Sequence, residues 1–268
     1  GDSCINGQDT TITIYVNPTP AIRVFTEDSV ICNGESTEIE VYNPNEFVFG
    51  DWEYDLVIDA DPEISGVSDT TIAGIADKII PVSIFNTDTI AHKVEYTFLP
   101  LKSIDDELLC AGGTDTTIVI WVNPTPEVLV NADDLFLCDG DTVNFEIRNP
   151  NDVRGDWYYD LFINSPDAIE GIPAGQVTAM LGYDATAMLE YTLRNTDTVA
   201  HEVEFRFEPW IDPDDGGEDC GQGEDTTITI TVYPTPEIRV KVNPDTIRCN
   251  DQYVTFDVRN PNRSLLGG

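Results

Sequence analysis

Basic residues are scarce in this chain of 268 residues, because 13 Lys and Arg stand against 50 Asp and Glu, for a formal net charge of −37. A chain this acidic repels nucleic acid and anionic membrane surfaces, so neither is expected as a partner. No hydrophobic run reaches the roughly 18 residues of a membrane-spanning helix. The acid leaves two interpretations open: a surface that stays soluble at high ionic strength, or sites for a cation such as Ca²⁺.

Histidine is nearly absent, which leaves little basis for catalysis. The two histidines, His92 and His201, occupy matching positions in two similar stretches, which is typical of a structural role. Neither G-x-S-x-G nor H-E-x-x-H occurs. The "RGD" at Arg154–Asp156 is matched by "FGD" in the first stretch and leads into Trp157, so we interpret it as coincidental. We therefore expect a protein that is not an enzyme.

Three nearly identical phrases show that the chain is a repeat. They are "DTTITIYVNPTP" from Asp9, "DTTIVIWVNPTP" from Asp115 and "DTTITITVYPTP" from Asp225, and their P-T-P segments are spaced by 106 and 110 residues. An N-P-N triplet follows each P-T-P at nearly the same separation, and "GDWEYDL" and "NTDTIAHKVEYTF" each recur once in closely similar form. A period near 108 residues is the size of a domain rather than of a solenoid repeat.

Alternation of hydrophobic and polar residues predicts strands throughout. In "TTITIYV" the isoleucines and the valine alternate with Thr and Tyr, and the other segments show no capped helical period. About seven short strands per repeat with a Trp on the third indicate an all-β protein of tandem immunoglobulin-like β-sandwiches in an extended array. The strands of the first repeat are expected at Ala21–Glu27, Glu35–Tyr42, Asp51–Ile58, Thr70–Ile75, Asp77–Phe85, His92–Leu101 and Asp115–Val122.

The repeat places the domain boundaries. Residues 1–17 are expected to be the last strand of an upstream domain, 18–123 and 124–233 two immunoglobulin-like domains, and 234–268 the first strands of a further one. On this interpretation the chain is a window on a longer array. The linkers carry two prolines within three residues, so the joints should be stiff and extended.

A family resemblance rests on the stretches "VICNGESTEIEV", "EISGV", "IFNTDTIAHKVEYTFLP" and "CAGGTDTTIVIWVNPTP" and their copies. They resemble the PKD-like, immunoglobulin-like repeats of very large surface proteins of Bacteroidetes-type bacteria. The resemblance covers essentially the whole chain and implies a stalk segment of a secreted, extracellular adhesin or filament at the cell surface. Its implied partners are neighbouring domains of the same chain, other filament copies or a cell-surface glycan.

The cysteines form two sets, one before the second strand of each repeat and one before the last strand: Cys32, Cys138 and Cys249, and Cys4, Cys110 and Cys220. In a sandwich these positions lie at opposite ends, roughly 25 Å apart, whereas a disulfide needs Cα atoms within about 7 Å. We therefore predict an interdomain bond between Cys32 and Cys220, with Cys110 and Cys138 paired outside the window. Two alternatives stay open: intradomain pairing of Cys32 with Cys110 and of Cys138 with Cys220, or free thiols.

The acid is densest in the loop "DPDDGGED", which holds two glycines. Its carboxylates and those of the turn before the second strand are candidate Ca²⁺ ligands, with solvated loops as the alternative. The candidate ligands are Asp212, Asp214, Asp215, Glu218, Asp219, Asp28 and Glu35.

Trp121 lies on the polar-facing side of its strand, so it is a candidate for binding a sugar or a neighbouring filament, or for packing on an adjacent domain. Trp52 and Trp157 are expected in the cores. Three functions follow from these patterns: a structural stalk, a glycan- or surface-binding module, and an accessory region of a secreted enzyme.

Overall fold

All of the regular secondary structure that the computed structural model describes is β-strand, as the alternating pattern predicted. The structure describes residues 8–45, 49–104, 108–110, 112–173, 177–243, 247 and 249–262. The chain divides into two compact units, one of Gly1–Thr87 with His92–Val122 and one of Asp88–Ala91 with Asn123–Gly268. A search of the described residues for a helix long and apolar enough to cross a membrane finds none.

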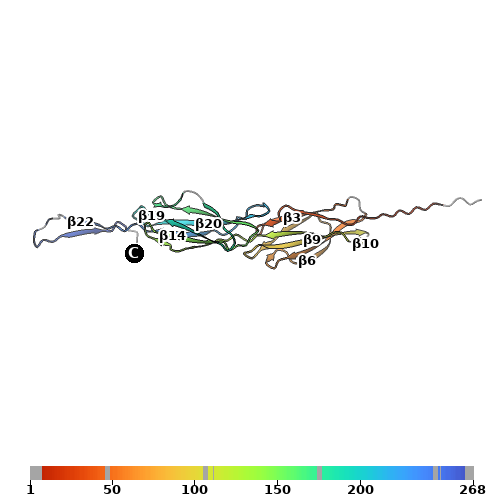
Figure 1. The fold of residues 1–268 in the computed structure, drawn as a ribbon, viewed down its shortest axis with the longest axis horizontal. Coiled ribbons are helices and arrows are strands. Elements are labelled where there is room, and N and C mark those ends of the chain that lie inside the picture. The colour runs from red at the N-terminus through yellow and green to blue at the C-terminus, as the bar shows by residue number, and fades with distance from the viewer. Residues whose placement is uncertain are drawn as a thin grey trace, which may run out of the picture. The chain divides into compact units, whose positions relative to one another are not determined.

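The first unit contains a sandwich of two sheets (Figure 1). One sheet is the three strands β1 (Arg23–Thr26), β3 (Ser36–Tyr42) and β7 (Ile79–Ser83). The other has the order β2 (Val30–Ile31), β11 (Thr116–Val122), β9 (His92–Ile104), β4 (Asp51–Ala60) and β6 (Thr70–Ile75), with β10 (Leu108–Cys110) paired to β9. A short pair joins β5 (Ile64–Ser65) to β8 (Phe85–Asn86).

The second unit repeats this plan. Its sandwich has one sheet of β12 (Leu129–Ala132), β14 (Thr142–Arg148) and β18 (Thr186–Thr192). The facing sheet has the order β13 (Phe136–Leu137), β21 (Thr226–Val232), β20 (His201–Pro213), β15 (Gly155–Asn164) and β17 (Val177–Met180). The pair β16 (Ile169–Glu170) and β19 (Arg194–Asn195) and the hairpin β22 (Arg239–Asn243) with β23 (Thr255–Arg259) complete the unit.

The strand Thr70–Ile75 forms where the sequence predicted it, but its partner is notable. In a constant-type immunoglobulin sandwich the fourth strand pairs with the fifth. Here β6 instead pairs with β4, in the sheet opposite to β7. The Asp69 carboxylate accepts a hydrogen bond from the Ala60 amide at 3.0 Å, which holds the start of β6 beside the end of β4.

Side chains of alternate residues fill the cores. In the second sandwich Phe145 of β14 lies 4.7 Å from Phe205 and 5.9 Å from Phe207 of β20, measured between ring centroids, and all three are fully buried. Burial of each such side chain contributes about 2 kcal/mol to folding. Trp157 is 2% exposed, as predicted for a core tryptophan. Trp52 is partly buried, and its indole N–H donates to the Ala21 carbonyl.

The N-terminal segment differs from its copies. Residues 1–17 are predicted to be the last strand of an upstream domain; the described part, residues 8–17, is not in a strand here, and Ile12, Ile14 and Val16 are 82%, 81% and 89% exposed. Two of the corresponding residues in β11, Ile120 and Val122, are fully buried. The physical reason is that β11 has β9 beside it and a core to face, whereas no described strand pairs with residues 8–17.

Candidate functional site: the N-P-N loops

The three N-P-N triplets form the same turn. In each, the backbone N–H of the second Asn donates to the side-chain oxygen of the first Asn: Asn45 to Asn43 at 2.9 Å, Asn151 to Asn149 at 2.8 Å and Asn262 to Asn260 at 2.8 Å. Asn favours such turns because its side chain mimics a backbone group, and the proline between them fixes φ. The turn places the second Asn side chain against the P-T-P linker of its own repeat.

The second Asn of each triplet binds this linker through backbone atoms. Its Oδ1 accepts from the amide that follows the P-T-P segment: from Ala21 at 2.9 Å, Glu127 at 2.7 Å and Glu237 at 2.6 Å. In the first two copies its Nδ2 also donates to the linker threonine carbonyl, Asn45 to Thr19 at 3.2 Å and Asn151 to Thr125 at 3.3 Å. One side chain therefore fixes both sides of the last linker proline.

Within the second unit this Asn makes one further bond. Asn151 Nδ2 donates to the Thr89 carbonyl at 3.3 Å, and Asn262 Nδ2 donates to the Thr198 carbonyl at 3.2 Å. Thr89 and Thr198 are the last residues of the two N-T-D-T turns. The exposed fractions of Asn151 and Asn262 are only 0% and 2%, so each bond is formed away from water.

Backbone bonds reinforce the contact at Asn151. The Ala91 amide donates to the Asp152 carbonyl at 2.7 Å, and the Asp152 amide donates to the Thr89 carbonyl at 3.2 Å. Ile90 and Asp152 form a β-bridge. The segment Asp88–Ala91 thus belongs to the second unit through a ladder in addition to the Asn side chain.

The N-T-D-T turn itself is anchored to the end of the last strand. Asn195 Nδ2 donates to the Val232 carbonyl of β21 at 2.8 Å and to Val199 at 2.7 Å. Asn86 makes the matching bond to Val122 of β11 at 2.9 Å. The pKa of the Asp197 carboxyl is lowered below its usual value, mainly because the Thr198 backbone N–H donates to it and, to a smaller extent, because of the hydrogen bond with His201. Hydrogen bonds therefore connect the end of β21 to the turn at Asn195, and this turn to the N-P-N loop at Asn262.

The linker is also held at its first residue. Asn123 Nδ2 donates to the Arg154 carbonyl at 3.1 Å, and the Arg154 amide returns a bond to Asn123 Oδ1 at 2.8 Å. Asn17 and Phe49 make the same pair of bonds, both at 2.9 Å. The third linker has Tyr233 at this position and cannot form the pair. The "RGD" arginine therefore has a backbone role at the start of β15.

A glycine three residues after each loop cysteine lets the loop approach the linker. A Cβ on Gly223 would lie 2.5 Å from the Pro126 carbonyl oxygen, and a Cβ on Gly113 would lie 2.3 Å from the Pro20 carbonyl oxygen. Real Cβ atoms do not approach backbone this closely, so only glycine fits.

Cys32 and Cys220 are each disulfide-bonded, and the bond between the two stays a prediction. Cys110, Cys138 and Cys249 are free thiols. Cys4 lies outside the described residues.

The candidate Ca²⁺ ligands lie in exposed or partly exposed positions with individual roles. Asp214 pairs with Arg154 at 3.2 Å, Asp215 accepts from the Gly217 amide at 3.2 Å, and Glu35 caps the Cys32 amide at 2.9 Å. Among the residues that the structure describes, no group of three or more His, Cys, Asp or Glu side chains is arranged to hold a metal ion. Ca²⁺ binding stays a prediction.

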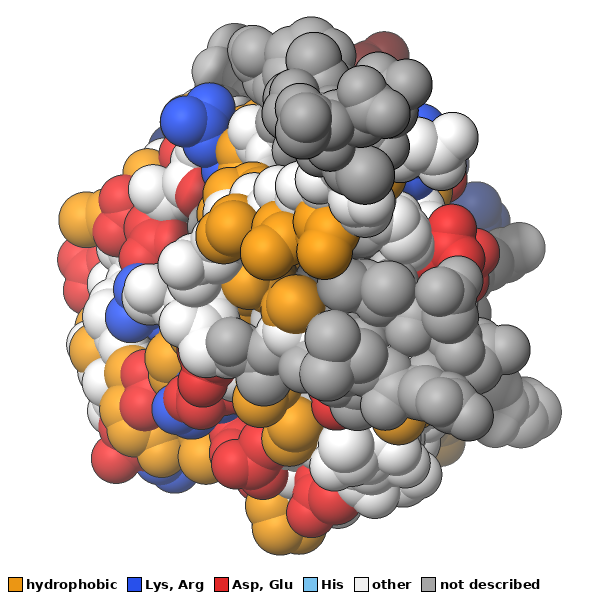
Figure 2. Space-filling model, turned by 90° about the vertical axis from the view of Figure 1, so that its right-hand side faces the viewer, with side chains coloured by type: hydrophobic (Ala, Val, Ile, Leu, Met, Phe, Trp, Pro, Cys, Tyr) orange, Lys and Arg blue, Asp and Glu red, His pale blue; other side chains and the backbone are white. Residues whose placement is uncertain are grey.

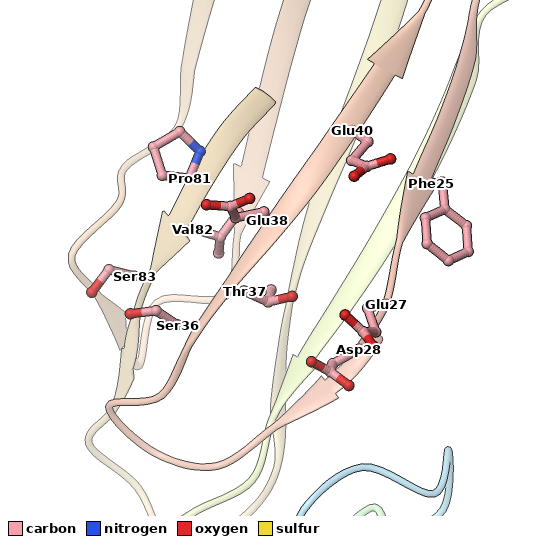
Figure 3. A pocket seen from close by; sticks show the side chains of 10 residues that line it. All are labelled: Phe25, Glu27, Asp28, Ser36, Thr37, Glu38, Glu40, Pro81, Val82 and Ser83. Atoms are coloured by element: carbon pink, nitrogen blue, oxygen red, sulfur yellow. The ribbon is translucent and has the colours of Figure 1, made fainter. Parts of the chain in front are cut away.

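Asp28 lines a hollow of about 430 Å³ on the first sandwich (Figure 3). Figure 3 shows that Glu27 lies beside it and that Glu38 and Glu40 come from β3. Acidic side chains also spread over the face in Figure 2, among hydrophobic and uncharged atoms.

Trp121 is only partly exposed, so it offers less surface to a sugar than a fully exposed ring would.

The second Asn of the triplet is a candidate functional residue that the sequence patterns did not single out. The recurrence of N-P-N marked the position, but only the structure assigns its side chain to the linker.

Comparison with known proteins adds distant similarity only. No family model matches the sequence, and no curated protein matches it. Similar solved structures include Escherichia coli alpha-2-macroglobulin activated by porcine elastase, at 9% identity and a TM-score of 0.30 over 85% of this chain and 24% of that one. Salmonella alpha-2-macroglobulin reacted with methylamine gives 10% identity and a TM-score of 0.29 over 84% and 17%. The chain spans less than a quarter of the length of either structure.

Proposed function

We propose that this chain is a structural stalk segment of a very large extracellular adhesin or filament, with tandem PKD-like, immunoglobulin-like domains that follow one another at stiff joints. Its partners are the neighbouring domains of the same chain, and it has no catalytic role. The secreted location is supported by the disulfide-bonded state of Cys32 and Cys220, since such bonds persist in oxidising compartments.

One observation carries the proposal: the buried Asn of the N-P-N loop makes the same bonds in Asn151 and in Asn262. In both copies Oδ1 accepts from the residue after the linker and Nδ2 donates to the N-T-D-T turn of the repeat before. A ligand-binding surface would gain nothing from repeating this arrangement, whereas a spacer needs every joint to be alike. A linker whose backbone is bonded on both sides of a proline is unable to swivel freely.

The disulfide and the acid give the proposal two further parts. We propose that Cys32 pairs with Cys220 and that this bond adds to the hydrogen bonds of a joint. We also propose that Ca²⁺ offsets repulsion between acidic loops at the joints, because a net charge of −37 opposes close packing without counter-ions.

Small-angle X-ray scattering tests the stalk on the whole chain, with Asn151→Ala as the matched variant. The wild type should give one narrow distribution of end-to-end dimensions, and the variant a broader one. A wild type as broad as the variant would show that the joints are hinges and would remove the basis of the proposal. A glycan array tests the rival binding module, and saturable glycan binding by the folded chain would favour it.

A further inference from the structure

The free edge of the three-stranded sheet differs between the two sandwiches. This sheet ends on β7 in the first and on β18 in the second. Pro81 lies opposite Glu38 of β3, and Glu190 lies opposite Asn144 of β14. Because Glu38 and Asn144 are each the third residue of their strand, Pro81 and Glu190 occupy equivalent positions.

The hydrogen-bond pattern shows which backbone groups point out of each sheet. In the second sandwich the Leu193 amide donates to the Asp141 carbonyl. The backbone N–H and C=O groups of the odd-numbered residues of β18 therefore point towards β14. The N–H and C=O groups of Thr186, Met188, Glu190 and Thr192 then point away from the sheet. In the first sandwich the Val41 amide donates to Lys78, so Pro81 is at an outward position.

Pro81 closes the first edge. Proline has no N–H, so at an outward position it costs the sandwich no bond and deprives an incoming strand of a donor. Figure 3 shows Pro81 on β7, the strand beside β3. Glu190 keeps its N–H, so the equivalent edge of the second sandwich stays open.

The other described edges of the two sandwiches are less suited to pairing. The strands β2 and β13 have two residues each, the strands β1, β12 and β17 have four each, and the ladder between β4 and β6 is interrupted by a register shift. In contrast, β18 has seven residues in unbroken register and a single charged side chain, Glu190. Met188, in its middle, is 64% exposed.

One end of this edge is already covered. A Cβ on Gly171 would lie 2.0 Å from the Thr192 carbonyl oxygen, so the chain beside β16 occupies that end. Among the residues that the structure describes, no hydrogen bond engages the backbone groups of Thr186, Met188 or Glu190. The open edge is therefore the stretch from Thr186 to Glu190.

We propose that this stretch is a self-association site, where β18 pairs antiparallel with β18 of a second copy around a two-fold axis at Met188. Outward groups then meet outward groups: Thr186 faces Glu190 of the second copy, and the two Met188 side chains face each other. Pairing centred on Leu189 would use the covered Thr192 end, and pairing centred on Glu190 would oppose two carboxylates. The proposal is independent of the stalk function, although in a filament it would join chains side by side.

Charge sets the conditions for pairing. Two chains of net charge −37 repel one another, so association should strengthen as salt rises from about 0.15 M to about 1 M, where the Debye length falls from about 8 Å to about 3 Å. One strand pair buries less than the roughly 1,200 Å² of a standard interface, so concentrations up to about 1 mM are needed.

Sedimentation equilibrium of the whole chain tests the site. The wild type should form a salt-promoted dimer, and Glu190→Pro should abolish it, because the first sandwich shows that proline fits this position. Circular dichroism checks that the variant is folded. A chain that stays monomeric throughout, or a dimer that Glu190→Pro leaves unchanged, would overturn the proposal.

Two charge variants test the register without relying on proline. Thr186→Lys places a cation opposite Glu190 of the second copy in both pairs and should tighten the dimer, whereas Thr186→Glu should weaken it. We expect the two dissociation constants to differ by about tenfold, from cross-strand pairs of this kind. Thr229→Lys and Thr229→Glu, on the opposite sheet, make the same changes in net charge and should differ little. Equal shifts at Thr186 and Thr229 would refute the register.

Discussion

Replacing Asn151 by alanine should weaken the second unit by an amount that the contacts define. The side chain makes three hydrogen bonds, to Glu127, Thr125 and Thr89, and it is fully buried. At about 1 kcal/mol for each bond, the substitution should lower the free energy of unfolding by about 3 kcal/mol.

Asn45→Ala is the matched control, because Asn45 makes the two linker bonds and no described bond to an N-T-D-T turn. It should cost about 2 kcal/mol or less, because Asn45 is partly exposed, so the larger loss at Asn151 reports the bond to Thr89 together with the deeper burial of Asn151. Urea denaturation of both variants gives the two values.

Hydrogen exchange locates the effect. The Ala91 amide is bonded to Asp152 beside Asn151, and a local loss of about 1 kcal/mol should speed its exchange about fivefold. Equal destabilisation by Asn45→Ala and Asn151→Ala, with unchanged exchange at Ala91, would show that the turn contact contributes nothing.

Four further outcomes are expected. Gly223→Ala should destabilise the chain by about 2 kcal/mol or more in urea denaturation, because its Cβ would collide with the Pro126 carbonyl. Burial, and to a smaller extent the nearby Asp77 charge, raises the pKa of Tyr54 to about 12. The free energy of unfolding should therefore fall by about 1.4 kcal/mol per pH unit as the pH rises from about 10 towards 12. Tyr54→Phe should reduce this slope in alkaline melts. Cys32→Ser should cost about 2–5 kcal/mol in thermal melts, whereas Cys138→Ser, at a free thiol, should cost little. Millimolar Ca²⁺ should raise the melting temperature above that at matched ionic strength, and equal melting would count against calcium at the joints.

The strands could be predicted from the sequence because alternation is local. Each predicted strand of the first repeat overlaps an observed one, since a residue such as Ile39 or Val94 is buried by the face it occupies. The neighbour of Thr70–Ile75 could not be predicted, because alternation says which face is buried and not which strand lies beside it.

The candidate site was only half visible for a similar reason. The recurrence of N-P-N marked the loop, but the partners of Asn151 lie 24, 26 and 62 residues away. No local pattern specifies a contact across such separations. The carboxylates were predicted as Ca²⁺ ligands only because many of them lie close together in the sequence. Several of them, such as Asp214 and Glu35, form an ion pair or a hydrogen bond within the protein.

The atoms that the N-P-N asparagine binds are all main-chain atoms, at Thr89, Thr125 and Glu127 around Asn151 and at Thr198 and Glu237 around Asn262. Main-chain atoms are the same in every residue except proline, so the surfaces of two successive repeats are free to diverge without disturbing these bonds. A repeat that keeps its N-P-N triplet can follow any other repeat that keeps its turn. In the proposed stalk, the number and order of repeats could therefore change without redesign of their connections.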